Sequence, residues 1–408
     1  MSVKLQRLQF EARRVAGWTT TALGFTIPIW VVADSILIGL LIVCWAACGE
    51  WREKIRRITT NPVAVSAILL FAWLLLGALW GEGDLEERAM WVKKYASLLF
   101  IPLVISLSVD DGERKRALLA LAVSLVGTLM LSLVLSVGLF SPKEGLTCDS
   151  DNPCVFKKHT THGLLMGFGA LLFGVLAWKA SQRWGRWGWA VASCLAASNV
   201  LLMVQGRTGY VVLAGLAMLA FHSYWGWRGM LVATIALSVM FSMAYYASTA
   251  FHDRVNLVAT GVTQWNPQMA TYDGVTERLE FFYHTAEIIQ DHPLTGVGTG
   301  GFAKAYAVQV RDLELPVPTH PHNQYLLVMA QVGVVGICLL LWLFVQQWRS
   351  TSVAVDGADA LLARGVVVTI AISCLFQPAL ADHTEKLFYC LFSGLLFSNT
   401  NPPAETKI

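Results

Sequence analysis

The chain has 408 residues, of which 55% are hydrophobic and only 14% are charged, with a net charge of +3 and a mean hydropathy of +0.55. A soluble domain carries roughly 25% charged residues, so this composition excludes a soluble globular protein. The small net charge gives no indication of nucleic-acid binding. The apolar residues form blocks of about 17–25, the length that crosses a hydrocarbon core, and predict an all-α polytopic membrane protein.

Twelve apolar stretches are predicted to span the membrane. Their approximate ranges are 17–33, 35–49, 62–80, 92–108, 115–140, 162–178, 187–205, 209–222, 229–248, 323–347, 362–380 and 386–398. The first follows a basic N-terminus without a small-residue cleavage site, so we interpret it as a retained span and not as a signal peptide. The predicted organisation is transmembrane helices 1–9 in residues 1–248, a large outer loop in 249–322, helices 10–12 in 323–398 and a tail in 399–408.

The distribution of basic residues predicts the orientation. The N-terminus contains Lys4, Arg7, Arg13 and Arg14, and the alternate loops that follow contain "WREKIRR", "DGERKR" and "KASQRWGR". Cytoplasmic loops of membrane proteins are enriched in Lys and Arg. This side and both termini are therefore predicted to be cytoplasmic, and the other loops are outside.

Two outer loops have features of their own. One contains "CDSDNPC", whose Cys148 and Cys154 are the only cysteines outside a predicted span. A disulfide between them suits an oxidising exterior, and two free thiols are the alternative. The other loop, 249–322, is long enough to indicate a function. It contains a predicted amphipathic helix whose apolar face would be Leu279, Phe282, Ala286 and Ile289.

Four separate segments bring unusual polar residues to the outer side. The residues are Arg207 and Tyr210 in "QGRTGY", Arg278 in the amphipathic helix, the pair His322 and Asn323 that opens span ten, and Asp382 at the end of span eleven. Each has a structural alternative. Arg207 could lie at the interface with its stem in the bilayer, Arg278 could be a solvated charge, and His322 and Asp382 could be helix caps.

The residue types indicate a chemistry. Arginine offers a permanent charge and a planar fork that suits phosphate oxygens, so Arg207 and Arg278 could hold a pyrophosphate as it leaves. Histidine titrates near neutral pH, so His322 could take a proton from a hydroxyl. The combination fits glycosyl transfer from a lipid pyrophosphate to an alcohol. The clustered acids that would hold Mg²⁺ are missing, so we predict no metal and no cofactor.

Two other motifs suggest binding sites of different kinds. "GVGTGGF", residues 296–302, fits a G-x-G-x-x-G pattern, but no strand precedes it and there is no room for a βαβ unit, so we expect a tight turn after Pro293. The pairs His320/His322 and Asp382/His383 could build a zinc site, although none has the spacing of a structural site.

The stretch "HNQYLLVMAQVGVVG" resembles the H-[NSQ]-x9-G-x-x-G motif of bacterial O-antigen ligases, with His322, Asn323, Gly333 and Gly336 at the fixed positions. "HPLTGVGTGGF" resembles a segment that this family shares with O-antigen polymerases and related oligosaccharyltransferases. Twelve spans and one large periplasmic loop also agree, so the resemblance covers nearly the whole chain.

The resemblance implies a GT-C-like glycosyltransferase of the bacterial inner membrane with its active site at the periplasmic face. Such enzymes transfer O-antigen from undecaprenyl pyrophosphate to a sugar hydroxyl of the lipid A-core, with inversion and without metal. His322 would be the general base, and Arg207 and Arg278 would contact the pyrophosphate. Asp382 and Asn323 would bind substrate, as would Tyr210 and the pair Lys94 and Tyr95, a weaker match at the outer end of span four.

Rival functions remain at this point. An O-antigen polymerase or a protein O-oligosaccharyltransferase would use a similar site, and the x9 spacing favours a ligase. A transporter of lipid-linked sugars would place its polar residues near the bilayer midplane, whereas the residues above are predicted at one surface.

Overall fold

The computed structural model describes residues 3–107, 110–139, 148–247, 249–265, 276–311, 313, 315–351 and 357–398. In these residues every regular element is helical, and there is no strand. The helices before the long loop are α1 (Val3–Thr26), α2 (Val31–Ala47), α3 (Trp51–Thr60), α4 (Pro62–Gly77), α5 (Leu85–Tyr95), η1 (Ala96–Leu99), α6 (Phe100–Ser106), α7 (Asp111–Ser136), α8 (His159–Lys179), α9 (Arg183–Ser198), η2 (Asn199–Met203) and α10 (Arg207–Ala247). Those that follow are α11 (Thr249–Gln264), α12 (Thr276–Asp291), α13 (Phe302–Gln309), α14 (Gln324–Ser350), α15 (Gly357–Ser373) and α16 (His383–Leu396).

Each of the twelve predicted stretches falls on helix, but the first helix starts earlier than predicted. α1 begins at Val3, so the basic N-terminal residues are helical too. By length and composition, five stretches of the described residues can cross a membrane, namely Leu85–Ser106, α7, α8, Arg207–Met243 and α14, and a pair bent by 113°, α2 with α3, raises the number to six. The protein is therefore a multi-pass membrane protein, while the count of twelve and the GT-C-like architecture stay predictions.

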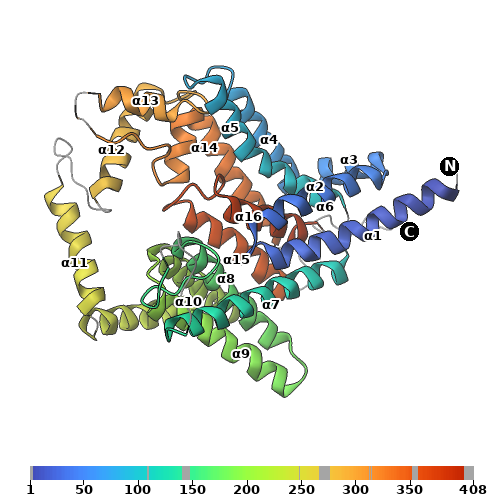
Figure 1. Ribbon diagram of the computed structural model, residues 1–408, viewed down its shortest axis with the longest axis horizontal. Coiled ribbons are helices and arrows are strands. Elements are labelled where there is room, and N and C mark those ends of the chain that lie inside the picture. Colours follow the sequence, from blue (N-terminus) through green and yellow to red (C-terminus); the bar gives the residue numbers. More distant parts are fainter. Residues whose placement is uncertain are drawn as a thin grey trace.

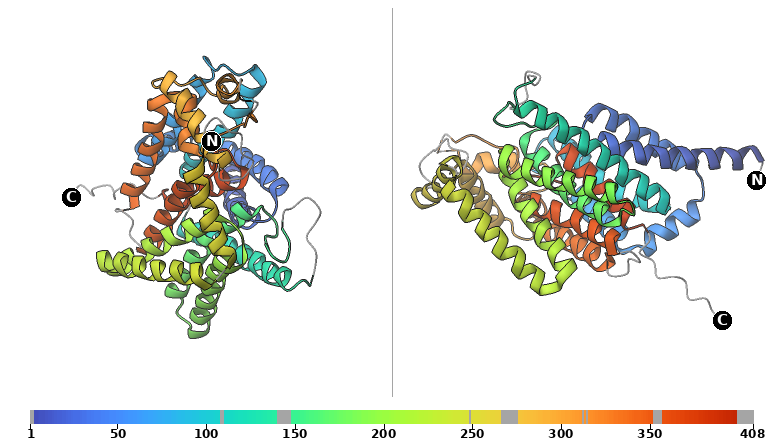
Figure 2. Two further views of the ribbon diagram at one scale, coloured as in Figure 1. Left: turned by 90° about the vertical axis from the view of Figure 1, so that its left-hand side faces the viewer. Right: turned by 90° about the horizontal axis from the view of Figure 1, so that it is seen from below.

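The helices of the long loop and the N-terminus lie at opposite ends of the molecule (Figure 1). α11 and α12 are at the left of that view, and the start of α1 is at the right beside α3. A view from below shows the same separation along the long axis (Figure 2). Which of these two ends lies outside the membrane stays a prediction.

α8 lies at the centre of the bundle, in contact with α7, α9, α10 and α15. Its partner α10 is two helices joined at Gly226, which has non-helical angles of φ 60° and ψ −143°. A Cβ on Gly229 would lie 1.9 Å from the carbonyl oxygen of Phe221, so the chain doubles back there. The break falls between the predicted spans 209–222 and 229–248 and confirms that they are separate helices.

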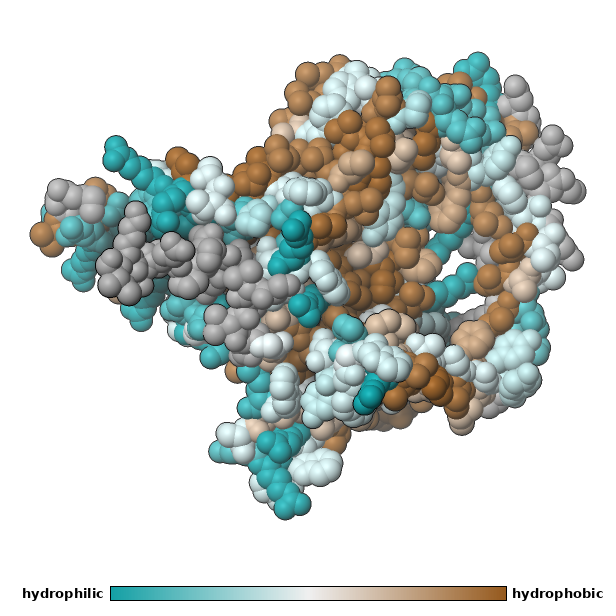
Figure 3. Space-filling view, turned by 180° about the vertical axis from the view of Figure 1, so that it is seen from behind, coloured by the Kyte–Doolittle hydropathy of each residue, from teal (hydrophilic) through white to brown (hydrophobic). Residues whose placement is uncertain are grey.

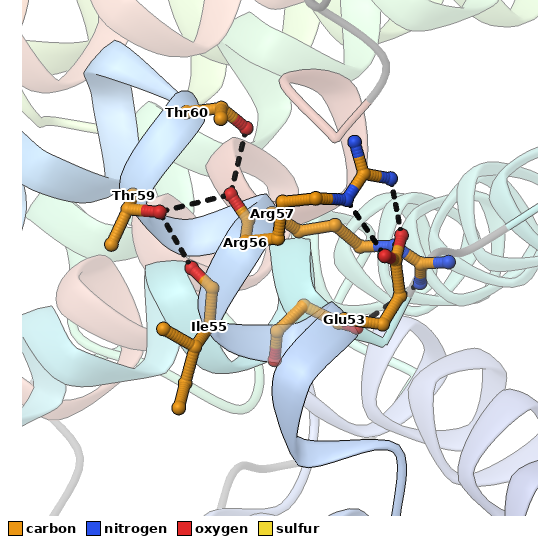
Figure 4. Close-up of polar contacts among 7 residues, drawn as sticks. Glu53, Ile55, Arg56, Arg57, Thr59 and Thr60 are labelled. Atoms are coloured by element: carbon orange, nitrogen blue, oxygen red, sulfur yellow. Dashed lines mark hydrogen bonds and ion pairs between the residues drawn. The ribbon is translucent and has the colours of Figure 1, made fainter.

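The basic stretch after α2 forms the short helix α3. Glu53 accepts hydrogen bonds from Arg56 at 2.6 and 2.7 Å and from Arg57 at 2.9 Å (Figure 4). These residues are three and four positions apart, so they are neighbours on one helix face. The hydroxyls of Thr59 and Thr60 bond back to carbonyl oxygens of the preceding turn. α3 is thus a polar helix that lies across the end of the bundle after a sharp bend.

α14 is interrupted at Val332 and Gly333, and the glycine-rich stretch after Pro293 fills the break. The amide of Val297 donates to the carbonyl of Ala330 at 2.9 Å, and Val334 donates to Pro293 at 3.0 Å. Irregular backbone inside a membrane protein requires partners of this kind, because no water is present to supply them. The glycines therefore form a tight packed turn, as predicted, and not a nucleotide site.

The glycines of the two motifs are structural for this reason. Gly333 has φ 66°, and a Cβ there would lie 2.0 Å from the carbonyl oxygen of Leu294. Gly298 has φ 80°, and its Cβ would lie 2.2 Å from the Cα atom of Gly81. The motif H-x9-G-x-x-G thus combines a polar helix start with a glycine at which another loop must approach closely.

We expect Gly333→Ala to destabilise the protein, because a left-handed residue other than glycine costs about 1–3 kcal/mol and the Cβ also clashes. The measurement is the thermal unfolding midpoint in detergent. Gly127→Ala in α7 is the matched control, since nothing lies within 4 Å of its Cβ position. A Gly333→Ala protein that unfolds at the same temperature as the control variant would contradict the tight packing.

Candidate functional site

Four helix N-termini and one loop helix meet at the end of the bundle that is predicted to be outside. The predicted site residues stand at these helix starts. Arg207 is the first residue of α10, His322 immediately precedes the N-cap Asn323 of α14, and Asp382 is the N-cap of α16. His159 is the first residue of α8, and Arg278 lies in the first turn of α12. Helix N-termini carry partial positive charge, so their convergence favours an anionic ligand.

Hydrogen bonds join the start of α14 to the connection between α15 and α16. The amide of Gln324 donates to Cys374 at 2.7 Å, and its side-chain oxygen accepts from the amide of Leu380 at 3.0 Å. His322 and Asp382 are each two residues from these bonds. The two predicted site residues, 60 positions apart in the chain, are therefore held close together.

The starts of α8 and α10 are held together by glycines. A Cβ on Gly209 would lie 3.0 Å from the Cα atom of Gly163, and a Cβ on Gly206 would lie 3.0 Å from the carbonyl oxygen of His159. Side chains at these positions would separate the helices. The small residues on both sides of Arg207 thus allow the first turn of α10 to lie against the first turn of α8.

Arg278 and Arg207 are close enough to interact electrostatically. Burial lowers the pKa of the half-buried Arg278 guanidinium, and Arg207 lowers it further, while Glu277 has the opposite effect. Neither guanidinium forms an ion pair within the part of the chain that the structure describes. Two neighbouring guanidinium groups that no carboxylate of the described residues neutralises favour the binding of a polyanion.

The helix that carries Arg278 presents a different side to the bundle from the one predicted. Leu279, Phe282, Ala286 and Ile289 do share one side of α12, but they are only half-buried. The buried side chains are on the adjacent side and include Phe281, His284, Thr285 and Ile288. The buried His284 has a polar partner on this side of the helix, because the carboxylate of Glu287 lies 2.8 Å from its Nδ1 atom. A prediction from the spacing of apolar residues alone does not detect such polar contacts.

His322 lies between two aromatic rings. Phe281 stacks on it with ring centroids 5.9 Å apart and 14° between planes, and His320 meets it edge-on at 4.5 Å. Burial lowers the pKa of His322, and Arg278 and Lys158 lower it further, whereas Asp382 raises it. The ring is therefore neutral near pH 7 and able to accept a proton.

Asp382 is paired with a residue that the sequence did not single out. Its Oδ2 atom lies 3.1 Å from Nζ of Lys158, the N-cap residue of α8. Its side chain makes no capping hydrogen bond to α16. Asp382 therefore occupies the N-cap position of α16 without capping the helix through its side chain, which instead bridges α8 to α16.

The other predicted site residues have structural contacts. Asn323 caps α14, accepting from the amides of Tyr325 and Leu326 at 2.9 and 3.1 Å. The Tyr210 hydroxyl donates to the carbonyl of Val204 at 3.3 Å at the start of α10. These contacts fix the helix starts on which the charged residues stand, and the substrate-binding roles assigned from the sequence remain predictions.

Lys94 and Tyr95 point to different surroundings. Tyr95 is fully buried, and its hydroxyl donates to the side-chain oxygen of Gln331 at 2.9 Å, next to the break in α14. Nζ of Lys94 lies 4.2 Å from the ring centroid of Trp91. Lys94 is close enough to Asp382 to interact with it electrostatically. Of this pair, Lys94 is thus nearer to the charged site.

The sequence did not identify Lys158, His159 or Phe281 as functional, and it offered His320 only as a possible zinc ligand. One signal was available. "FKKHTTHG" puts two lysines on the outer side, where the other loops are rich in acids, just before a predicted span. Positive residues are disfavoured there unless they have a task. No comparable signal marks Phe281, whose contact with His322 depends on the fold.

No cluster of ligating side chains in the described part of the chain supports the alternative of a zinc site. Among the described residues, no three His, Cys, Asp or Glu side chains converge as metal ligands. His383 is directed elsewhere, with its Nε2 atom 3.4 Å from the buried carboxylate of Asp34. The pair Asp382 and His383 is thus divided between two contacts.

The loop before α8, which is predicted to be outside, contains a disulfide between Cys148 and Cys154. The loop is joined to the start of α10, because the side-chain oxygen of Asn152 accepts from the amide of Gln205 at 2.9 Å. The predicted pair of cysteines therefore lies in a segment that borders Arg207.

The surroundings of the site include openings and an apolar cavity. Seen from behind, the surface has openings between the arm that α11 forms and the rest of the molecule (Figure 3). A separate cavity of about 520 Å³ lies further along α8 and α10, between residues such as Gly167, Leu171 and Leu213. Arg207, Arg278 and His322 do not line this cavity.

Residues 192–341 match the sequence model of the O-antigen ligase family. The resemblance predicted from the sequence is thereby confirmed. The matched region includes Arg207, Arg278, His322 and Asn323. A protein of Rickettsia felis (strain ATCC VR-1525 / URRWXCal2), described as "Putative polysaccharide ligase", is 22% identical over 354 residues, which are 76% of this chain and 79% of that protein. These similarities support a function of the ligase or polymerase type in polysaccharide assembly.

Proposed function

We propose that this O-antigen ligase relative transfers O-antigen from undecaprenyl pyrophosphate to a sugar hydroxyl of the lipid A-core at the periplasmic face of the inner membrane. The observation that carries the proposal is the position of Arg207 and Arg278, two neighbouring guanidinium groups without ion-pair partners in the described structure, next to the neutral His322. A diphosphate supplies the negative charge that this arrangement lacks.

In the proposed reaction His322 accepts the proton of the acceptor hydroxyl as its oxygen attacks the anomeric carbon of the donor. The bond between that carbon and the phosphate oxygen breaks from the opposite side, so the configuration inverts. The bonding electrons leave with the lipid diphosphate, and Arg207 and Arg278 stabilise the charge that develops there. The step needs no oxidant and no further reactant.

The surroundings support a lipid substrate. The openings between α11 and the bundle suit an isoprenoid donor that enters sideways (Figure 3). The apolar cavity along α8 and α10 starts beyond the charged ends of the same two helices and suits a hydrocarbon chain. Both substrates are lipids whose reacting groups lie at the interface, which explains a polar site at the mouth of apolar helices.

The position of the charged residues argues against transport. Transporters place their binding groups near the midplane, often where a helix is broken. Here the break in α14 is filled by the glycine-rich turn, and Arg207, His322 and Asp382 stand at helix starts. A site at the helix ends favours a transferase.

The test is reconstitution of the purified protein with undecaprenyl-pyrophosphate-linked O-antigen and rough lipopolysaccharide. A ladder of glycan attached to the core, with release of undecaprenyl pyrophosphate that depends on the acceptor, is the expected result. Growth of the lipid-linked glycan without any product on the core would identify a polymerase instead. Translocation of the donor without chemistry would identify a transporter.

We expect ligation to be unaffected by EDTA, because no acid cluster in the described residues is suited to hold a metal on the diphosphate. The measurement compares initial rates with and without chelator at constant ionic strength. Loss of activity that Mg²⁺ or Mn²⁺ restores would contradict metal-independent transfer.

A further inference from the structure

His322 has an unusual backbone conformation. Its φ of 53° is left-handed, and Glu50 is the only other described residue besides glycines with a positive φ. Side chains with a Cβ rarely adopt this conformation unless the surroundings impose it. The next residue, Asn323, returns to an extended conformation and caps α14. A specific interaction is therefore needed to hold His322 at this turn.

His320 supplies that interaction. The amide of His322 donates to Nδ1 of His320 at 3.2 Å, across Pro321. Asparagine and aspartate close similar turns when a side-chain oxygen accepts from the amide two residues later. An Nδ1 atom that accepts must be unprotonated, so the proton of the neutral His320 ring is on Nε2.

Burial, with a contribution from nearby charges, favours the neutral ring of His320. Burial lowers the pKa of His320 to about 4, with further contributions from His322, Lys94 and Lys158, and Asp382 acts in the opposite direction. A protonated ring would carry hydrogen on Nδ1 and lose the bond. The lowered pKa of His320 thus favours the unprotonated Nδ1 atom that this hydrogen bond requires.

The two histidine rings are also in contact. His320 meets the His322 ring edge-on, and Phe281 stacks on it. The backbone bond fixes where the Cα–Cβ bond of His322 points, and the two rings limit rotation about it.

We propose that His320 is a positioning residue that holds His322 in its left-handed conformation and so aims its ring at the acceptor hydroxyl. His320 acts through His322 and does not itself touch the reacting atoms. The inference depends on the proposed function, in which His322 is the base.

The test compares two substitutions at this position in the full-length protein. His320→Leu removes the acceptor and should lower kcat by about 10–10²-fold with the KM for the donor little changed, because misplacing a catalytic group costs up to about 10²-fold. His320→Asn keeps an acceptor for the amide two residues later and should restore most of the rate. His222→Leu, at an exposed histidine in α10, is the matched control.

Two results would overturn the positioning role of His320. A His320→Leu enzyme with the native kcat would overturn the inference, and so would a folded His320→Asn enzyme that is as slow as His320→Leu. If His320→Leu does not fold, the kcat and KM of His320→Asn against the native enzyme still give the decision. His322→Ala measured in parallel separates the two proposals. Activity that survives His322→Ala would show that His322 is not the base and would contradict the proposed function. An inactive His322→Ala enzyme together with a fully active His320→Leu enzyme would contradict only the positioning role of His320.

Discussion

Replacing His322 with alanine should nearly stop ligation while the protein remains folded and still binds the lipid pyrophosphate. An alcohol is a weak nucleophile at neutral pH, and a positioned base contributes about 10²–10⁴-fold. The measurement is the initial rate of core modification by the reconstituted protein. His322→Asn is the matched variant, because asparagine tolerates the left-handed backbone of this position but cannot act as a base.

The pH dependence of the native enzyme gives a second expectation for the same residue. The base works when the ring is neutral, so the rate falls as pH drops through the pKa of His322. Burial and the nearby cations Arg278 and Lys158 lower that pKa. The acid limb should therefore lie below the ordinary histidine value of about 6.5. Near-native turnover of His322→Ala with an unchanged acid limb would mean that another group is the base, and Asp382 would be the next candidate.

Arg207→Lys and Arg278→Lys should each lower the rate of ligation substantially. Lysine keeps the charge but loses the planar fork, and the loss of one pre-organised donor costs about 10²–10³-fold, so roughly 10–10²-fold is expected when the charge remains. The measurement is kcat/KM for the donor. Arg183→Lys is the control, since Arg183 is an exposed first residue of α9, as Arg207 is of α10. Full activity of both lysine variants would contradict a bidentate clamp.

The helices were predictable because the apolar blocks have the length of a membrane span. Each block lies on helix, and the break at Gly226 separates two predicted spans. The sequence did not predict the interruption of α14. Its apolar pattern continues through Val332 and Gly333, and the reason for the break is a contact with the turn after Pro293, 40 residues earlier in the chain.

The charged residues of the candidate site could be singled out because arginine and histidine are unusual at the ends of apolar helices. Arg207, Arg278 and His322 could be placed on one side from the topology alone. The residues that contact them could not be predicted. The pairing of Lys158 with Asp382 and the stacking of Phe281 on His322 join segments far apart in the chain. The hydrogen bond from His322 to His320 is local, but it depends on a backbone conformation that the sequence does not specify.

The most direct test of the assignment is an electron cryo-microscopy structure of the protein with undecaprenyl pyrophosphate. The diphosphate is predicted to lie between Arg207 and Arg278, with its oxygens in hydrogen-bond distance of both guanidinium groups, and His322 should face the side from which an acceptor hydroxyl would attack. A diphosphate bound away from both arginines, with His322 remote from the lipid head, would contradict the proposed active site.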